Sequence, residues 1–156
     1  MAAHHIPEGY HSVTPYLIVD GADAAIRFYG EAFGAAEVLR MPMGESGKLA
    51  HAEVKIGDSH VMLADEFPEV GHLGPHKRGG PTASLMIYVP DVDAAYAKAI
   101  GAGAKEERPP ADQFWGDRMG TLLDPFGHRW TLATHVEDVA EGEMQRRMAE
   151  AFKQPA

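Results

Sequence analysis

The sequence has no cysteine among its 156 residues, and this absence removes several kinds of chemistry. Disulfides, thiolate nucleophiles, cysteine-ligated zinc and iron–sulfur clusters all need a sulfhydryl group. Long apolar runs are also missing, since no stretch approaches the ~18 residues that a membrane span requires. The opening residues, MAAHH, lack the apolar region of a secretory signal. We therefore expect a cytoplasmic protein with no membrane partner.

Positive charge is scarce, because 14 Lys and Arg stand against 23 Asp and Glu, for a formal net charge of −9. A nucleic-acid partner needs a clustered basic face for its phosphates, and the short pairs Lys77-Arg78 and Arg146-Arg147 do not make one. The hydrophobic fraction of 45% is that of an ordinary globular protein. The length suits one domain, or two small modules that share a core.

A repeated segment is present at a spacing of about 70 residues. The run VDGADAAI at Val19–Ile26 returns as VPDVDAAY at Val89–Tyr96. Apolar residues precede both copies, and a Gly-Ala pair follows each. Chance similarity of two Ala-rich helices is the alternative, but it does not explain the matching flanks. We predict two diverged copies of one unit.

Each copy predicts a strand, an amphipathic helix and three further strands. Asp20 and Asp91 are expected to cap the two helices, and Gly34 and Gly103 to end them. The strands expected after the helices are Glu37–Met41, Leu49–Ile56 and Ser59–Ala64 in the first copy, and Lys105–Glu107, Met119–Leu123 and Arg129–Thr134 in the second. The fold class is therefore α+β, with two βαβββ modules and mixed, mostly antiparallel sheets.

The chain divides into five expected segments. The connection at 65–81 is rich in Gly and Pro, and its length is typical of a linker or a lid. In the C-terminal segment, an apolar stripe could face a second subunit; it consists of Val139, Met144, Met148 and Phe152. The segments are a flexible N-terminus at 1–12, module 1 at 13–64, a linker or lid at 65–81, module 2 at 82–135 and a C-terminal helix at 136–156.

Strand alternation assigns one face of each sheet to the helices and leaves the other face for a cup-shaped cleft. The Gly57-Asp58 turn should place Lys55 opposite His60, and Glu53 opposite Met62. A merely solvated face is the alternative. Residues expected on the cleft side are Thr14, Tyr16, Ile18, His51, Glu53, Lys55, His60 and Met62 in module 1, and Ser84, Met86, Tyr88, Arg129, Thr131 and Ala133 in module 2.

A loop in the second copy reads Trp115-Gly116-Asp117-Arg118. A Trp and an Arg beside a Gly suit the rim of a pocket, where a ring stacks and a guanidinium binds an anion. Trp115 could equally plug the core.

The duplicated unit, together with Asp124-Pro125-Phe126-Gly127-His128 before the last strand, resembles the vicinal oxygen chelate superfamily. This superfamily contains glyoxalase I, bleomycin-resistance proteins and extradiol dioxygenases. The runs His51–Ser59, Trp115–Arg118 and Asp124–Trp130 resemble its PhnB-like branch in particular. The resemblance covers about residues 13–136 and implies a homodimer.

Metal-dependent members of this superfamily hold a divalent ion with His, Gln or Glu on the first and last strands of each module. The resemblance carries these positions onto Thr14, Met62, Ser84 and Thr131, none of which is a usual ligand for Zn, Ni, Mn or Fe. We therefore expect no metal and no other cofactor. A relocated His51, Glu53 and His60 triad is the alternative metal site.

The resulting hypothesis is a metal-free protein that binds a small molecule for sequestration or resistance. One alternative is a lyase or isomerase in which His51 and Glu53 form an acid–base pair. Others are a metal-dependent enzyme with displaced ligands and a dimeric scaffold without a ligand. The ligand-binding residues proposed from the sequence are Tyr16, Lys55, His60, Met62, Met86, Tyr88, Trp115, Arg118 and Arg129.

Overall fold

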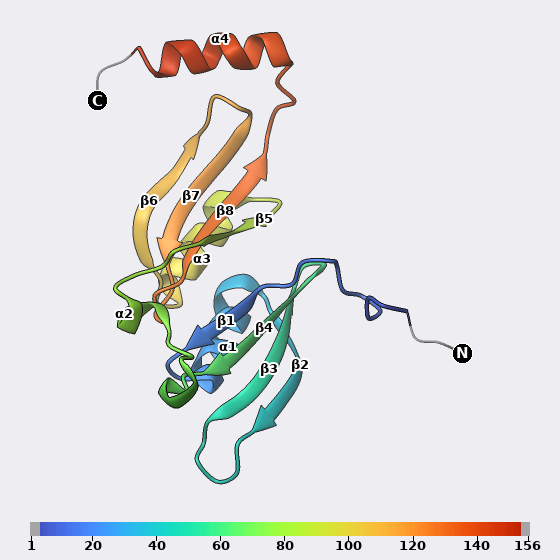
Figure 1. Cartoon of the computed structure of the whole chain (residues 1–156). Helices are drawn as coiled ribbons and strands as arrows, with labels where there is room; N and C mark the ends of the chain where they lie inside the picture. The colour runs from blue at the N-terminus through green and yellow to red at the C-terminus, as the bar shows by residue number, and fades with distance from the viewer. Residues whose placement is uncertain (1–3, 154–156) are drawn as a thin grey trace.

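A computed structural model describes residues 4–153 and contains two four-stranded sheets with helices (Figure 1). The α+β class and the two βαβββ modules predicted from the sequence are confirmed. The elements are β1 (Tyr16–Val19), α1 (Ala22–Phe33), β2 (Ala36–Pro42), β3 (Leu49–Ile56), β4 (Ser59–Asp65), η1 (Pro68–Val70), α2 (Pro75–Arg78), β5 (Ser84–Tyr88), α3 (Val92–Gly101), β6 (Lys105–Asp112), β7 (Asp117–Leu123), β8 (Arg129–His135) and α4 (Glu141–Ala151).

The two sheets have the same topology, β1-β4-β3-β2 and β5-β8-β7-β6. In each, the first and last strands of the module pair in parallel and the other pairs are antiparallel. The predicted register holds in the first hairpin, where Lys55 pairs with His60 and Glu53 with Met62. The duplicated sequence therefore folds as a duplicated structure. β1 and β5 are edge strands.

Strand β6 is longer than the sequence predicts, because it continues through Pro109-Pro110 to Asp112. Its register shifts between Arg108 and Ala111. Proline lacks the amide hydrogen that a central strand needs, but an edge strand with a bulge tolerates it.

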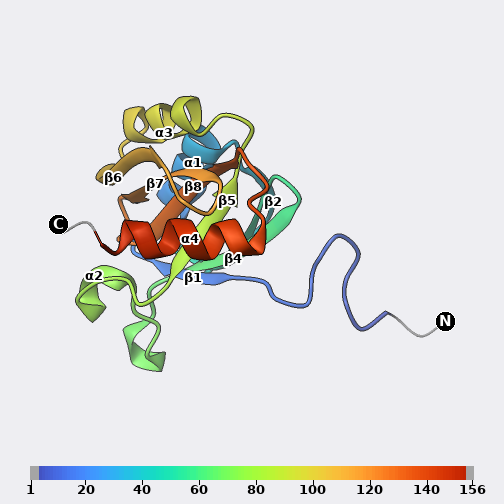
Figure 2. The same ribbon diagram turned by 90° about the horizontal axis from the view of Figure 1, so that it is seen from above.

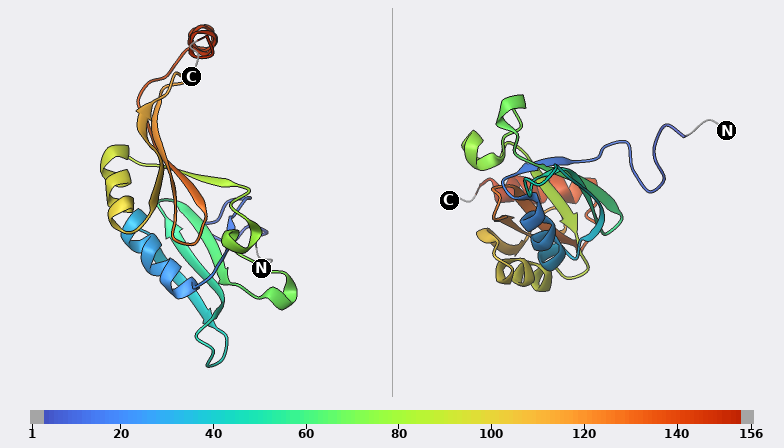
Figure 3. Two further views of the ribbon diagram at one scale, coloured as in Figure 1. Left: turned by 90° about the vertical axis from the view of Figure 1, so that its left-hand side faces the viewer. Right: turned by 90° about the horizontal axis from the view of Figure 1, so that it is seen from below.

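One apolar core lies between the helices and the sheets. Helices α1 and α3 contact each other and lie on the same side of the two sheets (Figures 2 and 3). The side chains assigned to this side by alternation are buried or half-buried: Leu17, Val19, Ala52, Val54, Ile56, Val61, Leu63, Leu85, Ile87, Trp130 and Leu132. The opposite side of each sheet, called its open face below, is free of these helices.

The start of α1 differs from the prediction. Asp20 is exposed, and the residue that precedes the helix is Gly21, with no capping bond from its own side chain. The Asp65 carboxylate, at the end of β4, instead accepts the amides of Gly21 and Ala22 at 2.9 Å and that of Leu49 at 2.7 Å. The buried Asp65 thus joins α1, β3 and β4. Asp91 caps α3 as predicted, through the amide of Ala94.

The connection between the modules is held against module 1. Buried Glu66 accepts the amide of Gly74 at 2.8 Å and a hydrogen bond from Lys77. His76 is hydrogen-bonded to the carbonyl oxygen of Pro125 in module 2 at 3.1 Å. These contacts attach the connection to both modules.

Helix α4 lies beyond the end of the second sheet (Figure 1). Met144 is half-buried, whereas Met148 is 44% and Phe152 80% exposed. The expected N-terminal segment and C-terminal helix extend into residues 1–3 and 154–156, which lie outside the described residues. Over residues 4–153, no helix has the length and apolarity to span a membrane.

The capping of α1 gives a matched pair of variants. Asp65→Ala leaves three backbone amides without their acceptor and should lower the free energy of unfolding by roughly 3 kcal/mol. Asp20→Ala should change it by less than about 0.5 kcal/mol. Urea denaturation of the two variants beside the parent protein measures both values. Equal losses would contradict the assignment of the cap to Asp65.

Candidate functional site

The open face of module 1 carries most of the site residues predicted from the sequence. Tyr16 comes from β1, His51, Glu53 and Lys55 from β3, and His60 and Met62 from β4. Leu39 and Met41 of β2 pair with Glu53 and His51 and therefore lie on the same face.

A hydrogen-bonded chain crosses this face from Tyr16 to His51 to Glu53. The Tyr16 hydroxyl lies 2.8 Å from His51 Nδ1, and His51 Nε2 lies 2.9 Å from Glu53 Oε1. Because an ionised Glu53 accepts only, His51 Nε2 carries the proton and Nδ1 accepts from Tyr16. Residues two apart on a strand lie about 7 Å apart at Cα, so this contact depends on the side-chain conformations.

Glu53 is the charged centre of the face, although only 8% of the residue is exposed. Hydrogen bonds from His51 and then from Tyr10 lower the pKa of the Glu53 carboxyl, and burial only partly opposes them. Glu53 is therefore an anion at neutral pH. Burial, and then the Glu53 charge, raise the pKa of Tyr16, which keeps its phenol neutral.

Tyr10 is a contact that the sequence analysis missed, because it treated residues 1–12 as a flexible terminus. The Tyr10 hydroxyl donates to Glu53 Oε2, and its ring stacks on His60 with centroids 3.9 Å apart. His60 Nδ1 lies 3.0 Å from the carbonyl oxygen of Gly9. Apart from its aromatic ring, nothing in the sequence marks Tyr10.

The remaining predicted residues of this face lie around the chain of hydrogen bonds. His60 and Met62 are half-buried and Lys55 is exposed. His60 turns toward Gly9 and Tyr10, so it does not join His51 and Glu53 as the relocated triad required. Within residues 4–153, no three His, Asp or Glu side chains are grouped so that they could hold an ion.

The open face of module 2 has a different network, centred on buried Asp117. Its carboxylate lies 2.8 Å from His135 Nδ1 and accepts from the Tyr88 hydroxyl at 3.1 Å and from Trp115 Nε1 at 3.3 Å. Burial raises the pKa of the Asp117 carboxyl, but these hydrogen bonds outweigh it and leave the pKa below its ordinary value. Trp115 is half-buried beside this group. The predicted strands begin after Asp117 and end before His135, so the contact between these two residues was not predicted.

The backbone conformation at Gly116 shows why the Trp115–Arg118 run contains a glycine. Its φ is +98°, and a Cβ there would lie 2.0 Å from the carbonyl oxygen of Glu137. The amides of Val136 and Glu137 both donate to the Gly116 carbonyl. Only glycine permits this close approach. Gly116 therefore holds the chain just after β8 through these two hydrogen bonds.

Two predicted arginines are already paired. Arg129 forms a two-point ion pair with Glu107, at 2.6 and 2.9 Å, beside a cavity of about 600 Å³ on the module 2 open face. Arg118 pairs with Asp93 of α3 and with Asp112, on the helix side of the sheet. Arg118 therefore does not reach the open face, contrary to the prediction that it lines the binding site.

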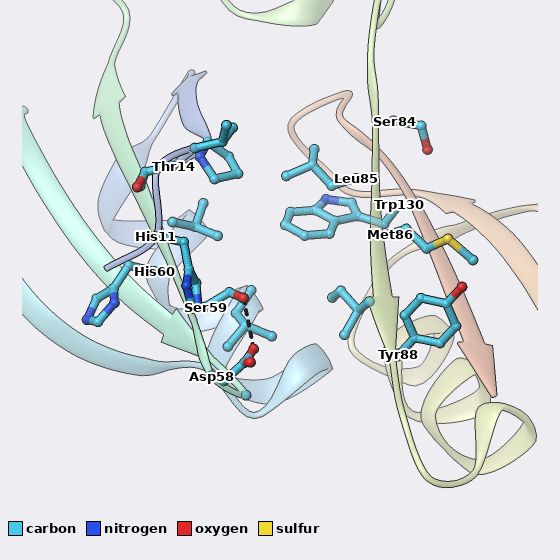
Figure 4. Close-up of a pocket in the computed structure, with 16 residues that line it drawn as sticks. His11, Thr14, Asp58, Ser59, His60, Ser84, Leu85, Met86, Tyr88 and Trp130 are labelled. Atoms are coloured by element: carbon cyan, nitrogen blue, oxygen red, sulfur yellow. Dashed lines mark hydrogen bonds between the residues drawn. The ribbon is translucent and has the colours of Figure 1, made fainter. Parts of the chain in front are cut away.

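A crevice of about 590 Å³ separates the modules (Figure 4). Leu85 and Trp130 point into it, whereas Ser84, Met86 and Tyr88 point away from module 1. Strand alternation predicts that Met86 and Tyr88 face a cleft, as Tyr16 does, and leaves open whether one chain or two form it. In a single chain the crevice does not bring these side chains together, because it opens on the helix-facing side of β5.

The sequence matches a known class of proteins. Residues 9–132 match the model of the Glyoxalase/Bleomycin resistance protein/Dioxygenase superfamily, and the chain is a member of that superfamily.

Its relatives include Mb0911c, an uncharacterized protein of Mycobacterium bovis, which is 41% identical over 141 residues that cover 88% of this chain and 92% of Mb0911c. The anthracycline biosynthesis protein DnrV of Streptomyces peucetius is 32% identical over 111 residues, or 71% of this chain but 36% of DnrV. The crystal structure of TioX from Micromonospora sp. ML1 has the same fold, with a TM-score of 0.62 and 24% identity over 83% of this chain and 100% of TioX.

The metal positions implied by the superfamily do not suit an ion in this chain. Thr14, Ser84 and Thr131 supply hydroxyl groups and Met62 a thioether, whereas Zn, Ni, Mn and Fe sites of this type use imidazole or carboxylate. Thr131 Oγ1 instead lies 3.3 Å from Thr121 Oγ1, and Ser84 points away from module 1 (Figure 4).

The pKa of Glu53 tests the hydrogen-bonded chain. NMR titration of the carboxyl carbon should give a pKa below the ordinary glutamate value. His51→Ala should raise it more than Tyr10→Phe, because the His51 contact is the larger cause, and Met41→Ala should leave it unchanged. Because the folded pKa is lowered, ionised Glu53 stabilises the fold at neutral pH, and this contribution is lost as the pH falls through the folded pKa. An unshifted pKa would contradict the network.

Proposed function

We propose that this chain is a small-molecule-binding protein of the PhnB-like branch that holds an organic ligand on the open face of module 1 without a metal ion. Sequestration of that ligand is the activity we assign to it. The observation that carries the proposal is the charged, nearly buried Glu53, held by His51 and Tyr10 on a face that also offers Met41 and Met62. A fixed carboxylate beside adaptable apolar side chains selects a ligand that has a hydrogen-bond donor.

The occupied nitrogens of His51 favour binding over catalysis. Nδ1 is engaged by Tyr16 and Nε2 by Glu53, so a reacting proton reaches the imidazole only after one contact breaks. A binding site needs no such step, because fixed polar groups orient a ligand better than mobile ones do. The biosynthetic role in the name of DnrV also supports a small organic ligand.

A homodimer is part of the proposal. The edge strands β1 and β5 offer backbone groups for pairing, and α4 exposes Met148 and Phe152. A second copy could complete the open face of module 1, which the module 2 residues of the same chain do not close.

Fragment binding tests the proposed site. A panel of small amines, alcohols and phenols is screened by NMR against protein dialysed with EDTA. Native mass spectrometry of the same sample gives the subunit count, for which we expect two. Glu53→Gln should weaken the hits at least tenfold, through loss of a charge-assisted hydrogen bond worth about 1.5–3 kcal/mol.

Thr121→Val is the matched control, because Thr121 holds the same position in the module 2 sheet and pairs with Thr131 as Glu53 pairs with Met62. It should leave the affinity unchanged. Hits that depend on added Zn²⁺, or that weaken equally in both variants, would contradict the proposal.

The contact between His51 and Glu53 also supports a second candidate function, a lyase or isomerase. Glu53 holds the Nε2 proton of His51, so Nδ1 is the basic atom, and it becomes available when the Tyr16 hydroxyl turns away. Such a base would remove a proton from a carbon next to a carbonyl group.

Proton exchange measures this second function directly. Hydroxyacetone in D₂O should acquire deuterium beside its carbonyl group when the protein is present, followed by proton NMR. His51→Ala should slow the exchange on the order of 100-fold, as for loss of a general base, while Thr121→Val in module 2 should not. Exchange no faster than in buffer would eliminate proton abstraction from this substrate.

A further inference from the structure

The Tyr10 side chain lies on the open face of module 1 in the way that a bound ligand would. Its hydroxyl donates to Glu53 Oε2, and its ring is nearly parallel to the His60 imidazole, with an interplanar angle of 14°. Tyr10 thus contacts both the Glu53 carboxylate and the His60 ring of this face. A phenol thus already satisfies the carboxylate that the proposed function assigns to the ligand.

The segment that carries Tyr10 is otherwise loosely attached. Most of residues 4–13 are exposed, including Val13 at 85%, and the chain extends away from the sheet toward the N-terminus (Figure 1). The amide of Tyr10 donates to the Pro7 carbonyl within the segment, and the Gly9 carbonyl contacts His60. The segment buries little apolar area, so its release costs little of the folding free energy.

Glu53 distinguishes among the groups that could replace Tyr10. An aryl carboxylate would meet a like charge at Glu53, and an aliphatic alcohol would lose the stacking on His60. A phenol keeps both contacts. Its hydroxyl donates, and its neutral form persists because the hydrogen bond with Glu53 raises the pKa of such a group, as it raises that of Tyr10 to about 12.

We propose that Tyr10 is a built-in competitor for this site, and that the ligand is a phenol whose hydroxyl donates to Glu53 and whose ring stacks on His60 after Tyr10 leaves. This inference rests on the proposed function and names the class of its ligand. The N-terminal segment then sets the affinity, because a site that Tyr10 leaves open a tenth of the time binds about tenfold more weakly.

The probe for this inference is 4-methylphenol, which has the same ring and hydroxyl as the tyrosine side chain. Tyr10→Ala should bind it on the order of tenfold more tightly than the parent protein does, as measured by calorimetry or by amide shift changes at His51, Glu53 and His60. Tyr10→Phe, which retains the ring without the hydroxyl, should lie between the two. Glu8→Gln, in the same exposed segment, should match the parent.

Further measurements distinguish failure of the competitor role of Tyr10 from failure of the proposed function. In the Tyr10→Ala protein, 4-methylanisole, which has no hydroxyl hydrogen, should bind at least tenfold more weakly than 4-methylphenol, and adding Glu53→Gln should reduce the difference, because a neutral amide oxygen accepts the hydroxyl more weakly. Equal affinity of the parent and Tyr10→Ala proteins, or weaker binding by Tyr10→Ala, would overturn the competitor role. If amines still bind in a Glu53-dependent way, the proposed function survives that result. If no fragment of any class depends on Glu53, the proposed function fails as well.

Discussion

The buried carboxylate of Asp124 is the group on which the arrangement of the two modules depends. Its Oδ2 accepts from Tyr29 of α1 at 2.8 Å and from Trp130 of β8 at 2.9 Å, while Oδ1 accepts the amides of Phe126 and His128 at 2.9 Å. A buried anion is tolerated only when its acceptors are satisfied. One side chain thereby ties the helix of module 1 to the last strand of module 2. The two sheets consequently present their open faces on the same side of the helices (Figure 3).

Within that frame, equivalent positions of the duplicated unit carry different chemistry. His51 and Glu53 on β3 correspond in register to Met119 and Thr121 on β7. Module 1 therefore has its carboxylate and imidazole within one strand, β3, whereas the module 2 pair, Asp117 and His135, lies at the ends of β7 and β8. Backbone pairing constrains where these side chains point but not what they are, so duplication preserved the scaffold and left each open face free to diverge.

The residues at the metal positions implied by the superfamily also differ in chemistry from the usual ligands of its metal-dependent members. Hydroxyl and thioether groups stand at the positions onto which the resemblance carries the metal ligands, and the buried carboxylate of this face is Glu53, on the strand beside Met62. An anion held by hydrogen bonds is a rigid acceptor, because each partner limits its rotation. The Tyr10 hydroxyl supplies one hydrogen-bond donor to this carboxylate within the chain itself.

The sequence by itself determined the repeat, which is a direct similarity between two segments of the chain. It also determined the alternation of the strands and the Gly57-Asp58 hairpin, since both depend on residues within a few positions of one another. It therefore placed Tyr16, His51, Glu53 and Met62 on one face. Only the tertiary structure decided that Asp65, not Asp20, caps α1, that Tyr10 reaches Glu53, and that Arg118 turns to Asp93. Those contacts join residues 25 to 43 positions apart. Local periodicity carries no information about them, because they depend on how the elements pack against one another in space.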